Sequence, residues 1–188
     1  MATKYKAKLT HKTDTTPFTI LIDRQKIRRE ENLEYLKDLN VKAFLGVIAW
    51  AEGGGYDFKY GAVANKRNDP WRFSDTSTHP GAGYGGKITA AGLYQITRET
   101  WKERAVDAMG ITDFTPATQD LITVDLLRTT GAADDIKNSD FDSCLKKAAR
   151  RWNALPLGKG LTNRITSQPY KPYEDVLEMY QSLGGSIK

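Results

Sequence analysis

Residues 41–55 have the sequence VKAFLGVIAWAEGGG. The nearly continuous apolar residues from Val41 to Ala51 predict a helix, and the three glycines that follow predict its end, because glycine readily takes the left-handed conformation of a helix C-terminus. Glu52 is therefore expected in the last turn of an apolar helix, at the point where a glycine-rich loop begins.

The carboxyl group of Glu52 is expected to have a raised pKa. The last carbonyl groups of a helix carry partial negative charge, which disfavours a second negative charge beside them. Partial burial also disfavours the ionised carboxylate. A pKa near neutrality suits a general acid. The same local pattern also fits a glutamate that points into water at a helix end, so it leaves both interpretations open.

The composition fits a single globular domain. The chain has 188 residues, 39% of them apolar, which is enough for one core. It contains no apolar run long enough to cross a membrane, and its N-terminus lacks the apolar segment of a signal peptide. The single cysteine, Cys144, excludes an intramolecular disulfide and is expected in the core. We therefore expect a protein that is made and folded in the cytoplasm.

The net charge of +5 suits an anionic partner such as nucleic acid, a membrane surface or a cell wall. The basic residues are scattered, however, and the basic run 24–29 is followed directly by Glu30 and Glu31. A solvated helix face explains that segment as well as a binding patch does.

The hydrophobic pattern predicts a mostly helical protein. Phe18, Ile20 and Ile22 alternate with other residues and predict a short strand, and Asn40 is expected to cap the helix that carries Glu52. Further helices are expected at residues 24–39, 90–109, 115–131, 139–155 and 172–183. Residues 1–16 are expected to be loose. Residues 53–89 are expected to form an irregular lobe, and irregular segments of such length tend to be functional.

One glycine-rich stretch is close to a nucleotide-binding phosphate loop. Residues 81–88 nearly match the pattern G-x-x-x-x-G-K-[ST], but Ile88 stands where a magnesium-binding hydroxyl is required. His79 and Pro80 precede the stretch in place of a buried strand. We interpret it as a mobile loop beside a cleft.

The sequence gives little support for a metal site or for a serine nucleophile. A zinc site needs clustered ligands, whereas His11, His79 and Cys144 are scattered along the chain. A Ser-His-Asp triad would depend on His79, and no nucleophile elbow accompanies Ser74 or Ser77.

Carboxylate chemistry remains. Asp57, Asp69 and Asp75 lie in the irregular lobe that follows Glu52. Most glycosidases use two carboxyl groups, so each of these aspartates is a candidate partner. Asp69 precedes Pro70 and fits a turn residue better.

Five short blocks follow one another in a specific order. They are Phe44–Gly53, Gly55–Asp57, Phe73–Pro80, Ala91–Ile96 and Trp152–Pro156. In this order they resemble blocks of the lambda-type phage endolysin family. The resemblance covers residues 41–185 and leaves residues 1–40 outside it. The Glu-Gly pair and the Gly-Leu-Tyr-Gln block are also similar to the wider lysozyme-like superfamily of lytic transglycosylases.

The resemblance implies a lysozyme-like α+β fold, in which a mostly helical lobe and a small β-containing lobe flank a glycan cleft. It implies cleavage of the β-1,4 bond between N-acetylmuramic acid and N-acetylglucosamine of peptidoglycan, for bacterial lysis. Glu52 would be the catalytic acid and then the base, and the product would carry a 1,6-anhydromuramyl end. The resemblance calls for no catalytic aspartate, metal or cofactor.

Further residues take supporting roles by their position in the matching blocks. Tyr94 and Gln95 would begin a helix that lines the cleft, and Trp152 and Asn153 would lie on its opposite wall, although Tyr94 and Trp152 also fit core positions. His79 would lie near the cleft or pack structurally. The expected substrate-binding residues are Asp57, Asp75, Ser77, His79, Tyr94, Gln95, Trp152 and Asn153.

Two other functions remain open. The first is a hydrolytic muramidase that uses Glu52 together with Asp57 or Asp75. The second is a non-catalytic module that binds glycan.

The implied partner is the glycan strand of peptidoglycan. We expect a monomer that binds no nucleic acid and does not insert stably into a membrane. It would be made in the host cytoplasm without a signal peptide and would reach periplasmic peptidoglycan through a holin or another delivery system. Residues 1–40 form an N-terminal extension, a strand and then a charged helix, and residues 41–188 form the catalytic domain.

Overall fold

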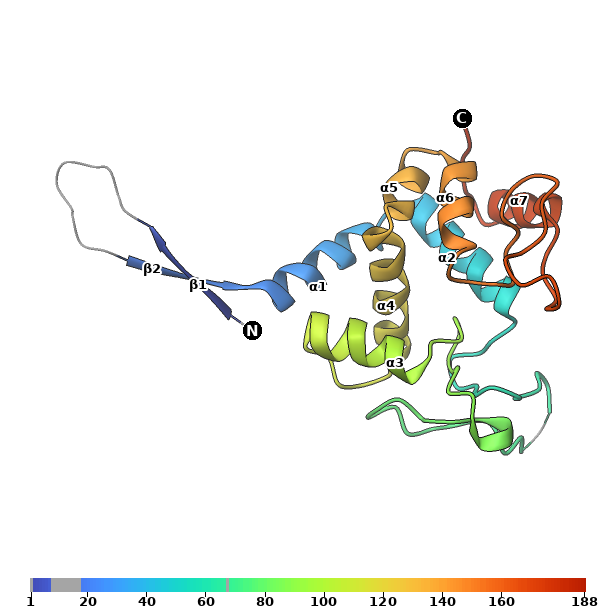
Figure 1. Cartoon of the computed structure of the whole chain (residues 1–188), viewed down its shortest axis with the longest axis horizontal. Helices are drawn as coiled ribbons and strands as arrows, with labels where there is room; N and C mark the ends of the chain where they lie inside the picture. The colour runs from blue at the N-terminus through green and yellow to red at the C-terminus, as the bar shows by residue number, and fades with distance from the viewer. Residues whose placement is uncertain (1, 8–17, 67) are drawn as a thin grey trace.

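The computed structural model describes residues 2–7, 18–66 and 68–188, and Figure 1 shows their arrangement. Within these residues helix is the predominant regular secondary structure. The strands are β1 (Ala2–Ala7) and β2 (Phe18–Asp23), and the helices are α1 (Arg24–Tyr35), α2 (Leu39–Glu52), α3 (Arg98–Trp101), α4 (Pro116–Thr129), α5 (Ala132–Lys137), α6 (Phe141–Ala148) and α7 (Tyr173–Ser182). A short 3₁₀ turn, η1 (Tyr84–Gly86), and a π-helical segment, η2 (Lys102–Asp107), complete them.

The first two strands form an antiparallel hairpin in which Ala2 lies opposite Asp23 and Ala7 opposite Phe18. The strand predicted around Phe18 is confirmed. The expectation that residues 1–16 are loose is wrong for β1, which pairs with β2. The sequence of β1 has no strand pattern of its own, so only the pairing with β2 defines it. The rest of that expectation, including His11, lies outside the described residues.

Helix α1 packs against α4 through a buried polar cluster (Figure 1). Arg28 donates two hydrogen bonds to the carboxylate of Asp125, at 2.7 and 2.8 Å, and Asn32 donates a third at 3.0 Å. Asp125 and Asn32 are both completely buried. A buried carboxylate needs such partners to offset its lost hydration. This cluster therefore attaches α1 to the helical lobe. The boundary predicted between residues 40 and 41 falls in the first turn of α2.

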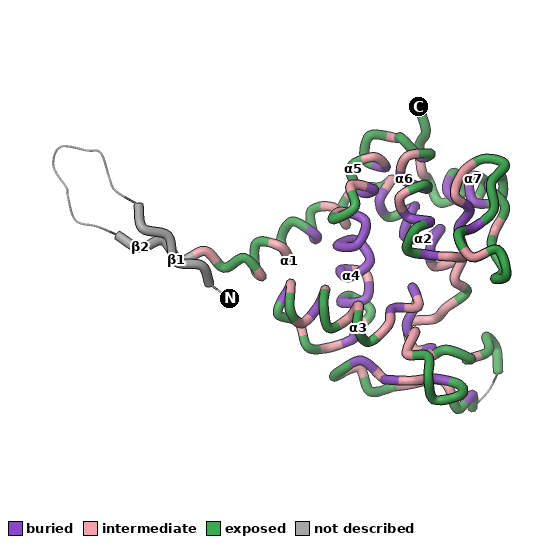
Figure 2. Tube along the Cα trace, in the orientation of Figure 1, coloured by how far each residue is buried: buried purple, intermediate pink, exposed green. Residues whose placement is uncertain are grey.

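Helix α2 forms the centre of the core. It contacts α4, α5 and α7, and its buried residues are Val41, Ala43, Phe44, Leu45, Val47 and Ile48. The buried stretches of α2 and α4 face each other in Figure 2. A helix that is apolar on most sides belongs in an interior, as the sequence predicts.

Both ends of α2 have local causes. The backbone N–H of Val41 donates to the side chain of Asp38 at 3.1 Å, so Asp38 is the N-cap. The prediction that Asn40 caps this helix is wrong, since its side chain instead bonds Ser139 and Ser186. The predicted end is confirmed, because Gly53 takes a left-handed conformation with φ of 63°.

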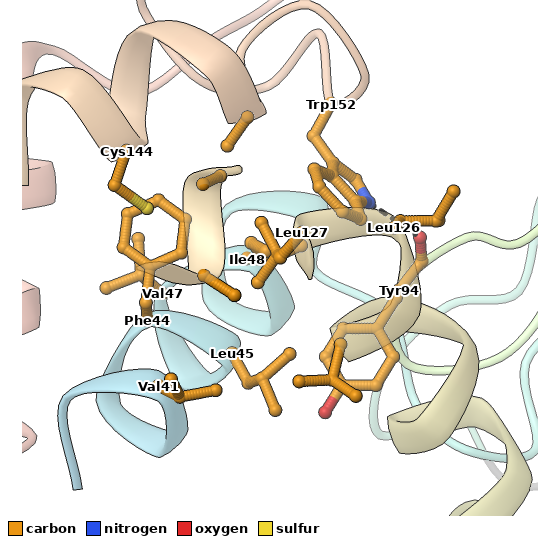
Figure 3. Close-up of a cluster of buried hydrophobic side chains, with 14 of the residues drawn as sticks. Val41, Phe44, Leu45, Val47, Ile48, Tyr94, Leu126, Leu127, Cys144 and Trp152 are labelled. Atoms are coloured by element: carbon orange, nitrogen blue, oxygen red, sulfur yellow. Dashed lines mark hydrogen bonds between the residues drawn. The ribbon is translucent and has the colours of Figure 1, made fainter. Parts of the chain in front are cut away.

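Aromatic rings close the core beside α2. Phe44 meets Phe141 and Tyr180 edge to face, at centroid distances of 6.2 and 6.3 Å. Cys144 is fully buried in the same cluster, as expected (Figure 3).

The predicted helix 90–109 begins later than expected, at Arg98. Gly92 and Gln95 have positive φ, which a helix does not accept, so residues 90–97 form turns and isolated bridges. Thr97 caps α3 by accepting a bond from the N–H of Thr100.

Other helices follow the pattern more closely. The predicted starts of α4, with Thr115 as N-cap before Pro116, and of α7, after Pro172, are confirmed. The predicted helix 139–155 is too long, because α6 ends at Ala148 and its last bonds shorten to a three-residue spacing. Helix α5 was not expected.

The irregular lobe predicted after Glu52 is confirmed. Among the described residues from 53 to 97, strand pairing is limited to single bridges, Phe58 with Arg72, Lys59 with Ala91, and Ala91 with Ile96. The helical part and this small β-containing lobe together form the predicted α+β architecture.

Candidate active site

A cavity of about 790 Å³ lies where the end of α2, the irregular lobe and the chain after α6 come together. This volume falls in the range of sites that bind small molecules. Of the residues expected at the site, the cavity is lined by Glu52, Tyr94, Gln95, Trp152 and Asn153.

Glu52 is half-buried at the C-terminus of α2, with its neighbour Ala51 also in the cavity wall. Burial raises the pKa of its carboxyl group to about 7, and the backbone N–H of Ala154 acts in the opposite direction by stabilising the carboxylate. A carboxyl group of this pKa is populated in both protonation states near neutral pH. It can therefore give and accept a proton within one cycle.

The loop after Glu52 is held by close backbone packing. A Cβ atom on Gly54 would lie 2.6 Å from the carbonyl oxygen of Gly92, so only glycine fits there. Gln119, from α4, ties both sides together: its side chain donates to the carbonyl of Tyr56 at 3.0 Å and accepts from the N–H of Leu93 at 2.9 Å. This buried amide fixes the turn beside Glu52.

Tyr94 and Gln95 lie in that turn and not at the start of a helix, which corrects the expectation. Tyr94 is buried, and its hydroxyl donates to Asp120 at 2.7 Å. The side chain of Gln95 donates to the carbonyl of Gly92 at 3.0 Å, from a left-handed backbone with φ of 50°. Such a conformation is uncommon for a residue other than glycine and often marks a functional position.

Trp152 and Asn153 follow α6 on the opposite wall. The indole N–H of Trp152 donates to the carbonyl of Tyr94 at 3.4 Å, so this contact joins the two walls (Figure 3). Trp152 is 6% exposed, and most of its ring is therefore part of the core. It lies in a turn beyond α6, whereas its expected core position was on a helix.

Asn153 organises the loop that follows. Its side chain accepts from the N–H of Ile165 at 2.8 Å and donates to Gln168 at 2.8 Å. Asn163 adds bonds from its amide to the carbonyls of Asn153 and Gln168, both at 3.0 Å. These bonds hold residues 163–168 against the cavity.

Four other expected residues do not line the cavity. The carboxylate of Asp57 pairs with Arg72 at 2.7 and 3.0 Å. Asp75 accepts from the N–H of Ser77 at 2.9 Å, which is a local turn.

His79 is the fourth of these residues, and it is buried. One ring nitrogen faces the carbonyl of Ile96 and the other accepts from the N–H of Gly81. The ring also packs 4.6 Å from that of Phe114. The second of the two placements expected for His79, structural packing, is the one observed.

Sequence reasoning did not find several of the lining residues. Arg150, Arg151, Arg164 and Tyr60 also line the cavity. For Arg150 and Arg151 the sequence held a signal, because two adjacent arginines come directly before the matching block Trp152–Pro156. Arg164 and Tyr60 had no such signal.

The charge of the cavity is asymmetric. Glu52 is the only carboxylic acid among the described residues that line it, against three arginines. No group of three or more His, Cys, Asp or Glu residues in the described part of the chain is placed to hold a metal ion. No helix among these residues is long and apolar enough to span a membrane.

The fold matches a solved structure titled bacteriophage lambda lysozyme complexed with a chitohexasaccharide. The TM-score is 0.63 with 23% sequence identity, and the match covers 90% of this chain and 99% of the lysozyme chain. A second structure, lysozyme from bacteriophage lambda, gives a TM-score of 0.61 with 21% identity over the same shares. The architecture is therefore the lysozyme-like α+β fold.

Sequence comparison defines the family. The Endolysin family model matches residues 42–187. The endolysin of Escherichia phage P2 is 29% identical, with 78% of this chain and 93% of the relative covered, and that of Escherichia phage lambda is 26% identical, with 78% and 92% covered. The chain belongs to the endolysin family, and it is a peptidoglycan-degrading enzyme of the kind that lyses bacterial cells.

Proposed function

We propose that this endolysin is a lytic transglycosylase in which Glu52 is the only acid and base. It would cleave the β-1,4 bond between N-acetylmuramic acid and N-acetylglucosamine. The supporting observation is that Glu52 is the single carboxylic acid among the described lining residues of the cavity. Hydrolysis by the usual route needs a second carboxyl group, as base or as nucleophile.

A single carboxyl group of intermediate pKa, that of Glu52, can carry out both proton transfers of the reaction. Protonated Glu52 gives its proton to the leaving oxygen of N-acetylglucosamine as the bond to C1 of the muramyl residue breaks. The resulting carboxylate accepts the proton of the muramyl C6 hydroxyl, whose oxygen then bonds C1 to form the 1,6-anhydro ring. Glu52 ends in its starting form. A pKa of about 7 supports both half-reactions at neutral pH.

The cavity suits a glycan. It combines polar groups with the exposed aromatic residue Tyr60, and aromatic faces pack well on apolar faces of ligands. The lambda lysozyme that shares the fold was solved with a chitohexasaccharide. We infer that glycan strands bind along the same cavity here, with Tyr94, Gln95 and Asn153 in its walls.

The deciding experiment is muropeptide analysis by mass. Purified peptidoglycan is digested with the wild type and with Glu52→Gln. We expect anhydromuramyl ends, each lighter than a reducing end by one water, from the wild type alone. Reducing ends only would instead establish the hydrolytic muramidase. A Glu52→Gln protein that still lyses cells would favour a non-catalytic binding module.

The positions of the two remaining candidates for a second catalytic carboxylate argue against hydrolysis. Asp57 is paired with Arg72, and Asp75 serves a local turn. Neither carboxylate lines the cavity that contains Glu52, so neither is placed to activate a water molecule there.

We further propose that the protein acts as a monomer and is made in the host cytoplasm. Access to periplasmic peptidoglycan would then depend on a holin or another delivery system. Expression of the chain alone should leave cells intact until the inner membrane is permeabilised. Lysis without permeabilisation would contradict this route.

A further inference from the structure

Three guanidinium groups line the cavity without a carboxylate partner. They belong to Arg150, Arg151 and Arg164, named here the arginine face. Elsewhere in the described chain, arginines such as Arg28 and Arg128 pair with acidic side chains. Within that same part of the chain, no ion pair joins any member of the arginine face to Asp or Glu. Unpaired positive charges in a cavity favour an anionic ligand.

The protein holds these residues in place by other bonds. Arg151 donates from Nη2 to the hydroxyl of Thr100 at 3.4 Å, which also lines the cavity. Arg164 belongs to the loop that Asn153 and Asn163 fasten. Burial lowers the pKa of Arg151 and the nearby charge of Arg104 acts in the same direction, whereas the weaker influence of Glu103 opposes them. The positive charge of Arg151 is thus incompletely balanced by the protein itself.

The arginine face lines the same cavity as Glu52. Arg150 and Arg151 precede Ala154 on one short segment, and the N–H of Ala154 acts on the carboxyl group of Glu52. If the proposed function holds, the muramyl residue sits at Glu52, because its C1 is the reacting atom. The substituent on its 3-oxygen is then the part of the substrate that carries negative charge in this cavity.

We propose that the arginine face binds carboxylate groups carried on the 3-oxygen of the muramyl residue. The source is either the lactyl carboxylate of glycan without peptide or the carboxylates of the peptide stem. Arginine suits this task because its planar fork can donate two parallel hydrogen bonds to one carboxylate. The inference rests on the proposed function and extends it to the choice of substrate.

Binding to three ligands tests the proposal. The ligands are chitohexaose, which has no carboxylate, muramyl glycan whose stems have been removed by an amidase, and the same glycan with its stems. Affinities are measured by calorimetry on Glu52→Gln protein, so that no ligand is cleaved. The test variant adds Arg150→Gln, Arg151→Gln and Arg164→Gln. The matched control adds Lys42→Gln, Lys146→Gln and Lys159→Gln, which remove equal charge outside the cavity lining.

We expect the arginine variant to bind the carboxylate-bearing ligands at least about tenfold more weakly, since charge-assisted bonds contribute on the order of 1.5 kcal/mol or more each. Chitohexaose should change less than about twofold, and the lysine control should match its parent. A loss only on the amidase-treated glycan assigns the lactyl carboxylate, and a loss only on the stem-bearing glycan assigns the stem. A loss on both shows that the arginine face binds either kind of carboxylate.

Other outcomes overturn the proposal. Unchanged affinity for all ligands, or an equal loss of affinity for chitohexaose, would show that the arginine face does not bind carboxylate groups. Reducing ends alone in the muropeptide analysis would instead overturn the proposed function, so the two failures are distinguishable. Thermal melting checks folding, and the single variants Arg150→Gln and Arg164→Gln, both at exposed positions, repeat the test should the triple variant be unstable.

Discussion

Gly54 lies against the backbone of the turn that carries Tyr94: a Cβ atom at Gly54 would come 2.6 Å from the carbonyl oxygen of Gly92 and 2.7 Å from that of Leu93. This contact joins the loop that leaves Glu52 to the turn beside it. The position of the acid relative to Tyr94 and Gln95 therefore depends on a glycine that makes no contact with substrate.

Substituting Gly54 should damage the site. Gly54→Ala is expected to force the two backbones apart, with a loss of about 1–3 kcal/mol in stability and at least a tenfold fall in activity. Gly53→Ala is the control, because its Cβ would meet nothing within 4 Å and only its left-handed φ is strained. Lysis rates and urea unfolding of both variants measure the difference. Equal damage by the two changes would contradict the packing argument.

The rate should depend on pH through one group. Because protonated Glu52 acts first, kcat/KM on soluble glycan is expected to fall as pH rises through about 7. A hydrolase that needs an ionised second carboxylate would also lose activity as pH falls toward 4. A pH profile with such an acidic limb would therefore argue against Glu52 as the sole acid and base.

The raised pKa of Glu52 also predicts how stability varies with pH. The folded protein holds this proton up to about pH 7, whereas the unfolded chain releases it near its ordinary pKa of 4.5. The folded state therefore binds more protons between these values, and its stability falls as pH rises across them. Glu52→Gln should be more stable than the wild type at pH 8, by on the order of 2–3 kcal/mol. The two should agree near pH 4, and an equal difference at both pH values would rule out this cause.

Asp57 and Asp75 should be dispensable for catalysis. Asp57→Asn and Asp75→Asn change groups outside the cavity lining, so we expect kcat within about twofold of the wild type, as for most surface changes. Turnover on soluble glycan measures this. Loss of activity in either variant, with folding intact by circular dichroism, would restore the hydrolytic alternative.

Truncation tests the role of residues 1–40. Removing residues 1–22 takes away the strand pair but keeps Asp23, the N-cap of α1, and should leave stability unchanged. Removing residues 1–37 also takes away Arg28 and Asn32, which bond the buried carboxylate of Asp125. The second truncation should lose about 3 kcal/mol in urea unfolding, since it breaks a buried ion pair on one side. Sacculus binding by both forms tests whether the hairpin or α1 also attaches the enzyme to the cell wall.

Sequence patterns predicted those elements whose signals are local. The start of α4 follows from Thr115 and Pro116, and the end of α2 from Gly53, because caps and stops act within one turn. Patterns failed at residues 90–97, where apolar spacing suggested a helix. There Gly92 and Gln95 adopt positive φ because the buried side chain of Gln119 and the backbone at Gly54 hold the turn from outside.

By itself, the sequence determined that a carboxylic acid ends the central apolar helix, because an apolar run followed by glycines specifies both the burial and the stop. Only the tertiary structure decided which groups surround that acid. It paired Asp57 with Arg72, kept Asp75 in a local turn, buried His79 in the core, and brought the arginine face into the cavity. The physical reason is that a cavity is lined by segments distant in the chain, and their meeting depends on core packing and buried bonds that no local spacing encodes.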